Sequence, residues 1–450
     1  MMRKLIYAGI FSTAFLLHYI SAPAQDYVPM PKLDSKRLLN DLQITVAETP
    51  DLGNGMTIGL VVRYGSTFDP ANKGGLAYLV SRMFMKATVD KKLQDIQDEL
   101  KYLGASIEVM CDWDGIRFLL RADSSACERS LLLLYQIVGE AEFDEESFKA
   151  EKQSILQAVQ KSTDPRRRIH QQFENVLFSG TTYGRPLMGT PASLSAIKLG
   201  DVRYFYRKFF SPGQTSLQIV GNVQSRAVLR IASRIWGVWI RKDDVPFTFN
   251  QPRQPAGRQI YVDDDPNSPA SQFIIGGLFP RREDPAYINV LFASHILQER
   301  LTRLLPTSLL TVGSEGRRLV SPFYIQGQAA AEQTVDQIQK IQQVIEEMKS
   351  NPVSNEEMEA ARKEMLEGYT SSFTSTDGLC NFLLDAELYR LGSNYSTLVM
   401  TQIRRCSVDM VKQATNDWIL PGGEVILIRG PLSTLKPILG PLGPYRRLSY

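Results

Sequence analysis

The sequence predicts an α+β protein made of two similar halves, each a mixed β-sheet with helices packed on it. Matching features recur along the chain: Asp201 with Asp409, and Ile219 with Ile426, lie at an offset of about 208 residues. A proline-rich stretch without apolar periodicity, residues 238–257, lies between the two copies. Strands pair as hairpins between helices rather than as strict βαβ units, which favours mixed sheets. We therefore expect a first domain at 25–237, a linker at 238–257 and a second domain at 258–450.

Length and composition limit the class of protein. A chain of 450 residues is too long for one ordinary core, and its 43% hydrophobic and 22% charged residues are typical of a globular protein. A net charge of +3 gives no indication of nucleic-acid binding.

The N-terminus has the pattern of a secretory signal. Arg3 and Lys4 precede a mostly apolar run, residues 5–20, and Ala22-Pro23-Ala24 has the small residues of a cleavage site. We expect residues 1–24 to be removed and the protein to be exported to the periplasm or cell envelope of a bacterium. A retained membrane anchor is the alternative, although the apolar run is short for a span and no later segment reaches that length.

Elements of the first half follow from apolar spacing and turn residues. Residues 25–50 read as an extended lead-in. The elements expected after it are a strand at 56–64, helices at 75–87 and 91–103, a hairpin of 105–111 with 116–121, helices at 125–140, 143–160, 166–180 and 194–210, and a strand at 215–220.

The second half repeats parts of this order. A strand at 323–330 and a helix at 335–348 match 116–121 and 125–140, and residues 351–357 open a long helix as 141–146 do. The segments 407–418 and 424–429 match 199–210 and 215–220.

Four cysteines, Cys111, Cys127, Cys380 and Cys406, are too few for a disulfide framework in a chain of this size. Cys111 and Cys127 could meet if the hairpin folds back on the following helix. Bridged and buried free thiols both remain open for these two, and the sequence does not decide the state of Cys380 and Cys406.

One stretch, residues 74–88 (GGLAYLVSRMFMKAT), carries the clearest motif. Leu76, Leu79, Val80 and Met83 recur at helical spacing and mark a buried face. The stretch resembles the helix that carries the inverted zinc motif H-x-x-E-H in the inverzincin peptidases, which include pitrilysin, insulinase and the mitochondrial processing peptidase. The matching framework residues are Gly75, Leu76, Ala77, Met83, Lys86 and Thr88.

The chemical residues of that motif are replaced. Tyr78, Ser81 and Arg82 stand where the family has histidine, glutamate and histidine. A guanidinium has no lone pair for a metal, and serine cannot act as a carboxylate base. The family's third ligand is a glutamate seven residues after another glutamate; Glu151 keeps the first position and Ala158 occupies the ligand position. We therefore predict no catalytic residues, no metal and no cofactor.

The resemblance implies two such halves around a chamber, in the metallopeptidase fold of the LuxS and processing-peptidase type. It also implies an exported, non-catalytic homologue that holds a peptide or unfolded polypeptide beside an active zinc-bearing H-x-x-E-H partner. The first alternative is a stand-alone structural, assembly or peptide-binding subunit without a protease partner. The second is a peptidase with a relocated site, although His170 and His295, the histidines after the signal segment, have no second histidine or cysteine at ligand spacing.

We predict that Arg82 replaces the charge of the metal and pairs with Glu151, because a buried carboxylate needs a partner. An Arg82 side chain that extends into solvent without a partner is the alternative. Substrate-binding residues are not assigned: the arginine and tyrosine that hold substrate in the family fall on Leu305 or Pro306 and on Val312 or Gly313, with Arg303 nearby.

Overall fold

The computed structural model describes residues 30–161, 164–306 and 308–448. The predicted signal segment, residues 1–24, and its cleavage point lie outside the described residues. Among the described residues, the helices that form are too short or too polar for any of them to span a lipid bilayer.

The first half is built around a six-stranded sheet with the order β1-β2-β6-β3-β5-β4. Its strands are β1 (Leu33–Arg37), β2 (Gln43–Glu48), β3 (Gly55–Val62), β4 (Ser106–Cys111), β5 (Ile116–Asp123) and β6 (Thr215–Gly221). Its helices are α1 (Leu76–Met83), α2 (Leu93–Tyr102), α3 (Cys127–Gly139), α4 (Glu145–Lys161), α5 (Pro165–Leu177), α6 (Pro191–Ala196), α7 (Leu199–Phe209) and α8 (Ser225–Trp236).

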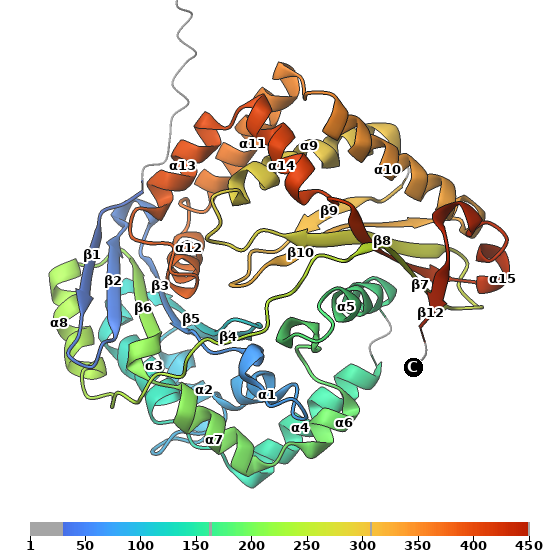
Figure 1. Cartoon of the computed structure of the whole chain (residues 1–450). Helices are drawn as coiled ribbons and strands as arrows, with labels where there is room; N and C mark the ends of the chain where they lie inside the picture. The colour runs from blue at the N-terminus through green and yellow to red at the C-terminus, as the bar shows by residue number, and fades with distance from the viewer. Residues whose placement is uncertain (1–29, 162–163, 307, 449–450) are drawn as a thin grey trace, which may run out of the picture.

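The second half contains another six-stranded sheet, with the order β12-β7-β11-β8-β10-β9. Its strands are β7 (Gly257–Asp264), β8 (Ser271–Phe279), β9 (Thr311–Ser314), β10 (Ser321–Ala329), β11 (Gly423–Gly430) and β12 (Tyr445–Arg447). Its helices are α9 (Tyr287–Leu304), α10 (Thr334–Ser350), α11 (Asn355–Ser371), α12 (Thr376–Leu388), α13 (Tyr395–Arg405), α14 (Val408–Trp418) and α15 (Leu432–Leu435). Figure 1 shows the two halves one above the other.

The prediction of two similar halves with mixed sheets is confirmed. In each sheet one parallel pair, β2 with β6 and β7 with β11, is followed by three antiparallel neighbours in the same order. The residues between α8 and β7, which we expected to form a linker, have no helix or strand.

Two segments differ from the sequence-based expectation. The extended lead-in at 25–50 contains β1 and β2, because β2 pairs in parallel with β6 across a long sequence separation and buries four consecutive residues. Strand β1 pairs with the free side of β2. The single helix expected at 194–210 is two helices, since Ile197 and Lys198 adopt extended backbone between α6 and α7.

Each half covers the inner face of the other half's sheet with one of its own helices. Helix α12 from the second half packs on β3 and β6, and α5 from the first half packs on β8 and β11. Both helices bury apolar side chains there, among them Leu384 of α12 and Phe173 of α5. The space between the sheets, where we expected a chamber, therefore contains two exchanged helices.

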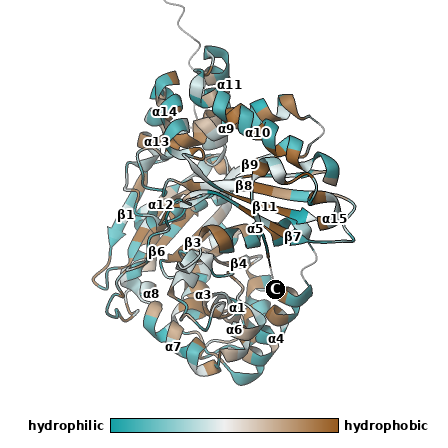
Figure 2. Cartoon of the chain, turned by 45° about the vertical axis from the view of Figure 1, so that its right-hand side comes forward, coloured by the Kyte–Doolittle hydropathy of each residue, from teal (hydrophilic) through white to brown (hydrophobic). Residues whose placement is uncertain are grey.

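The exchange of α5 and α12 explains why the central strands of both sheets are buried on two faces. Seven residues of β6 and nearly all of β8 and β11 are buried. Figure 2 shows brown, hydrophobic stretches in the strands of the second sheet between its outer helices and α5. A strand that is covered on both faces needs such a continuous apolar run.

All four cysteines are free thiols, and three of them are buried. Burial, with the nearby Asp112 charge, raises the pKa of Cys111 well above its ordinary value. Cys111 is thus not bridged to Cys127, and Cys380 is not bridged to Cys406. The four separate thiols have little thiolate character.

Candidate functional site

Helix α1 holds the residues that match the zinc motif, and its start is fixed by a buried carboxylate. Asp69 accepts hydrogen bonds from the backbone N–H groups of Gly75, Leu76 and Ala77. Gly75 has φ +92°, a left-handed conformation that glycine adopts without strain. Burial raises the pKa of Asp69 to about 7, against the lowering effect of these three hydrogen bonds. The helix therefore begins at one defined residue.

The three residues at the motif positions of α1 differ in burial and in their partners. The Ser81 hydroxyl is buried and donates to the Tyr78 carbonyl oxygen at 2.7 Å. The Tyr78 ring is half-buried against the core of the first half. Arg82 lies on the outer side, with 51% of its side chain exposed.

The structure brings Arg82 and Glu151 together, as the sequence suggested. Arg82 Nε lies 3.2 Å from Glu151 Oε2. A second cation that sequence reasoning did not include, Lys86, places its Nζ 2.6 Å from Glu151 Oε1. Glu151 is only 7% exposed, so Arg82 of α1 and Lys86, which follows α1, satisfy both oxygens of a buried carboxylate on α4. Lys86 lies in the turn that follows α1, four residues after Arg82.

This set of residues does not fit a zinc ion. The available atoms are a phenol, a hydroxyl that is already donating to its own helix, a guanidinium, and a carboxylate whose two oxygens are bonded to cations. Ala158 lies exposed on α4 and supplies no ligand atom. Zinc sites in proteins use imidazole, thiolate or free carboxylate groups. The α1–α4 pair therefore forms an ion-pair cluster at the place where the family motif would put a metal.

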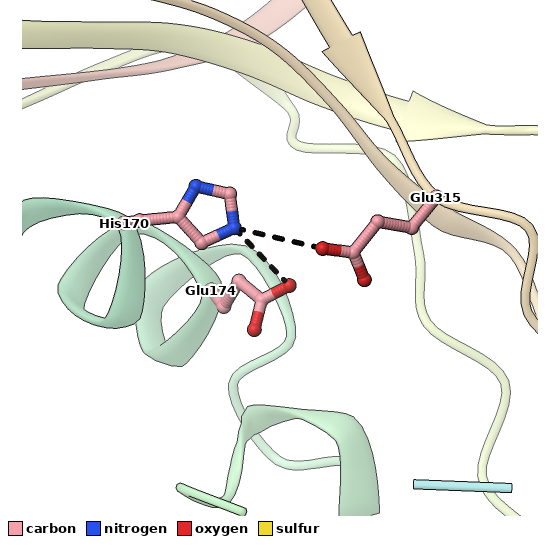
Figure 3. Close-up of side chains that lie close together, drawn as sticks. All are labelled: His170, Glu174 and Glu315. Carbon is pink, nitrogen blue, oxygen red and sulfur yellow. Dashed lines mark ion pairs between the residues drawn. The ribbon is translucent and has the colours of Figure 1, made fainter. Parts of the chain in front are cut away.

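The structure also combines three groups that the sequence left apart. Single ligand atoms from His170 and Glu174 on α5 and from Glu315 after β9 lie within 4.8 Å of one another. Figure 3 shows the imidazole facing the two carboxylates, with His170 Nε2 3.8 Å from Glu174 and 3.9 Å from Glu315.

A buried guanidinium already neutralises this cluster. Arg317 Nη2 donates to both Glu174 and Glu315, and its side chain is 4% exposed. Its Cζ lies 3.9 Å from the centre of the Trp113 ring. The two carboxylates thus face a fixed cation, which opposes the binding of a metal ion. Because α5 and Trp113 belong to the first half and Arg317 to the second, the cluster joins the two halves.

The segment of the second half where the family has its substrate-holding arginine and tyrosine was predicted to lack that pair. Leu305 follows the last residue of α9, and Val312 and Gly313 lie in β9, where neither carries a group that could replace the tyrosine. Arg303 is exposed on α9. These residues do not form a substrate clamp.

Fold and site together define a class of protein: a two-half α+β body of peptidase type whose zinc position holds an ion-pair cluster. Two family models match consecutive parts of the chain, the insulinase (peptidase family M16) model at residues 46–191 and the peptidase M16 inactive domain model at 196–365. The chain belongs to the peptidase M16 family.

Curated relatives match part of the chain at low identity. An uncharacterized zinc protease of Rickettsia bellii is 25% identical over 201 residues, which are 44% of this chain and 48% of that protein. The zinc protease PqqE of Helicobacter pylori is 21% identical over 262 residues, 57% of this chain and 59% of that protein. The match thus spans about half the length of these relatives.

Solved structures share the fold over nearly the whole chain. The peptidase M16 inactive domain from Pseudomonas fluorescens is 23% identical, with a TM-score of 0.81 over 89% of this chain and 98% of that chain. A protease from Helicobacter pylori has a TM-score of 0.82 at 17% identity, covering 89% of this chain and 100% of that chain. The first half of the periplasmic protease PqqL from Escherichia coli has a TM-score of 0.75 at 13% identity, covering 92% and 95%.

Proposed function

We propose that this chain is an exported, non-catalytic member of the family that holds a peptide or unfolded polypeptide beside an active, zinc-bearing H-x-x-E-H homologue. The observation that carries the proposal is the ion-pair cluster of Arg82, Lys86 and Glu151 at the zinc position. A carboxylate held by two cations cannot also act as a free base or a metal ligand.

Further observations support parts of this proposal. The solved structure from Pseudomonas fluorescens is described as an inactive domain, and a periplasmic protease shares the fold. The N-terminal residues have the pattern of a secretory signal, which agrees with the periplasm or cell envelope as its location. The proposal leaves the partner as the only source of zinc chemistry.

The test separates the chain from its partner. The purified chain is expected to contain no stoichiometric zinc and to leave unstructured peptides uncleaved. An active homologue co-purified from the native envelope, then expressed and purified alone, should cleave peptides faster after this chain is added back. Chelator-sensitive proteolysis by the chain alone, or an active homologue whose rate is unchanged by the chain, would contradict the proposal.

A second candidate function is a structural or assembly subunit without a protease partner. Three exposed apolar side chains favour it: Leu39, Val238 and Ile240 are 106%, 67% and 77% exposed. The Asn40 side chain donates to the carbonyl oxygens of Trp236 and Trp239, which holds the β1–β2 turn beside the end of α8. Such a patch is typical of a protein interface. If this candidate function is correct, replacing Leu39 and Ile240 by serine should abolish binding of the partner protein to this surface and leave peptide binding intact.

A further inference from the structure

A cavity of about 480 Å³ lies within the second half, among α9, α11, α12 and α13. Helices α9 and α11 are the counterparts of α1 and α4 in the repeat, because each pair follows the same strands of its sheet. The cavity is therefore in the second half, at the place that corresponds to the zinc position of the first. It is separate from the cluster of Arg82 and Glu151.

Most of the cavity wall is apolar. Leu291 of α9, Phe382 of α12 and Val399 of α13 are among its lining residues. Arg282, which follows β8, and Asn381 of α12 add polar groups to the same wall. A largely apolar cavity of this size with a few polar groups is the usual form of a binding site for a small ligand.

Arg282 is the charged group available to a ligand. Its Cζ lies 4.7 Å from the ring centre of Tyr287 and 5.7 Å from that of Tyr395. Among the described residues, no carboxylate oxygen is paired with its guanidinium at 4.0 Å or less. One hydrogen bond joins the guanidinium to the Tyr287 side chain, and a guanidinium has five N–H donors in all.

The other charged groups at this cavity have partners. Asp385 also lines it, but its Oδ1 lies 2.6 Å from Arg117 Nη1 of the first half. His295 Nε2 lies 2.7 Å from Glu364 Oε2 of α11. The Asp385 charge and a hydrogen bond with the Tyr287 side chain also act on Arg282, but the Asp385 carboxylate is bound directly to Arg117. Arg282 is therefore the cation beside the apolar wall that has no directly bound carboxylate among the described residues.

We propose that this cavity binds an apolar group that carries a carboxylate, with the carboxylate on Arg282 and the apolar part against Leu291, Phe382 and Val399. Arginine binds carboxylates through paired hydrogen bonds, and the apolar wall removes the attached carbon chain from water. Two kinds of molecule carry such an apolar group with a carboxylate: a peptide, at its C-terminal residue, and a small free aliphatic acid. In its peptide form the inference rests on the proposed function, for which it would supply the holding site.

The first measurement is titration calorimetry on the mature chain without any partner. A negative result here would contradict the ligand site, whereas a negative result in the add-back experiment would contradict the proposed function. The probes are an acetylated tetrapeptide ending in leucine with a free carboxylate, the same peptide amidated, one ending in lysine, and hexanoate. We expect saturable binding of the leucine peptide or of hexanoate, with a loss of at least about tenfold on amidation. Binding of the peptide identifies a chain end as the source, and binding of hexanoate alone identifies a free acid. Equal affinity for the free and amidated peptides, or no saturable binding of any probe, would overturn the proposal.

Variants locate the site. Arg282→Gln keeps a long polar side chain without the charge and should weaken binding by about tenfold or more. Arg281→Gln is the matched control, because the neighbouring Arg281 is exposed and pairs with Glu283 away from the cavity. Leu291→Trp should fill the cavity and abolish binding even if Arg282→Gln fails to fold. Full binding by folded Leu291→Trp would exclude this cavity as the site.

Discussion

Arg82 Nε on α1 lies 3.2 Å from Glu151 Oε2 on α4, so a guanidinium occupies the place of a metal ligand and bonds the carboxylate beside it. Lys86 takes the second oxygen of Glu151. A cation of α1, a cation in the turn after α1 and a buried anion of α4 thus form a structural contact between the two helices. The predictions below begin with this contact.

Loss of a single cation should cost little, and loss of both should cost much more. Arg82 is half exposed and Lys86 remains, so Arg82→Ala should lower the free energy of unfolding by about 1 kcal/mol or less. Arg82→Ala with Lys86→Ala leaves Glu151 buried without a partner, which should cost about 3 kcal/mol. Urea unfolding measures both, and Glu151→Gln in the double variant should recover part of the loss. Additive effects of the two single substitutions would contradict a shared partner.

Restoring the family residues should restore a metal site. A variant with Tyr78→His, Ser81→Glu, Arg82→His and Ala158→Glu places two imidazoles at i and i+4 on α1 and a carboxylate on α4. We expect stoichiometric zinc by elemental analysis, with proton release on binding. The same variant without Ala158→Glu is the control and should bind zinc more weakly. A folded four-residue variant without zinc would show that the helices no longer hold the required spacing.

Two glycines at corresponding positions of the repeat should allow the exchanged helices α12 and α5 to pack closely on the sheets. Gly59 of β3 pairs with Gln218, and Gly276 of β8 pairs with Val425, the counterpart of Gln218 in the repeat. A Cβ atom at Gly59 would overlap Cys380 Sγ on α12, and one at Gly276 would overlap the Phe173 ring on α5.

Gly59→Ala should therefore destabilise the protein by about 2 kcal/mol through overpacking. Gly55→Ala in the same strand is the control, because a Cβ atom there meets nothing within 4 Å. Thermal unfolding measures the difference. Adding Cys380→Ala should recover part of the loss, and a variant pair with equal stability would show that α12 is not held at this position.

The Arg317–Glu174 pair should make the contact between the halves sensitive to acid. Burial by itself raises the pKa of Glu174, but the charge and hydrogen bond of Arg317, with the nearby His170, outweigh it and lower the pKa below its ordinary value. A carboxyl whose folded-state pKa is lowered stabilises the fold above its unfolded pKa, and this contribution is lost as the pH falls through the folded value.

The stability difference between the wild type and a variant with Glu174→Gln and Arg317→Met should thus shrink as the pH falls below about 4.5. Arg317→Met alone should be more harmful at neutral pH, by about 3 kcal/mol, because it leaves Glu174 buried and charged. Urea unfolding at several pH values measures both. A difference that stays constant down to pH 3 would exclude the pair as the acid-sensitive contact.

The sequence predicted β3, β4, β5, β6, β10 and β11 and most helices, because apolar periodicity and turn residues act locally. It also indicated Arg82 and Glu151 as neighbours, since the family pattern relates their two helices. It did not indicate β1 and β2, whose pairing depends on β6 about 170 residues later in the chain. Nor did it indicate the cluster of His170, Glu174 and Glu315, in which two groups come from α5 and one from a loop of the other half.

The sequence by itself indicated the repeat and the family, and it predicted that Tyr78, Ser81, Arg82 and Ala158 stand at the positions of the zinc site, because these depend only on residue identity and spacing. Only the tertiary structure decided that α5 and α12 exchange places, that Lys86 completes the Glu151 pair, and that Arg317 rather than a metal faces Glu174. Periodicity shows which face of a helix is apolar but not which sheet will cover it. A long charged side chain can likewise reach several partners, and packing selects one of them.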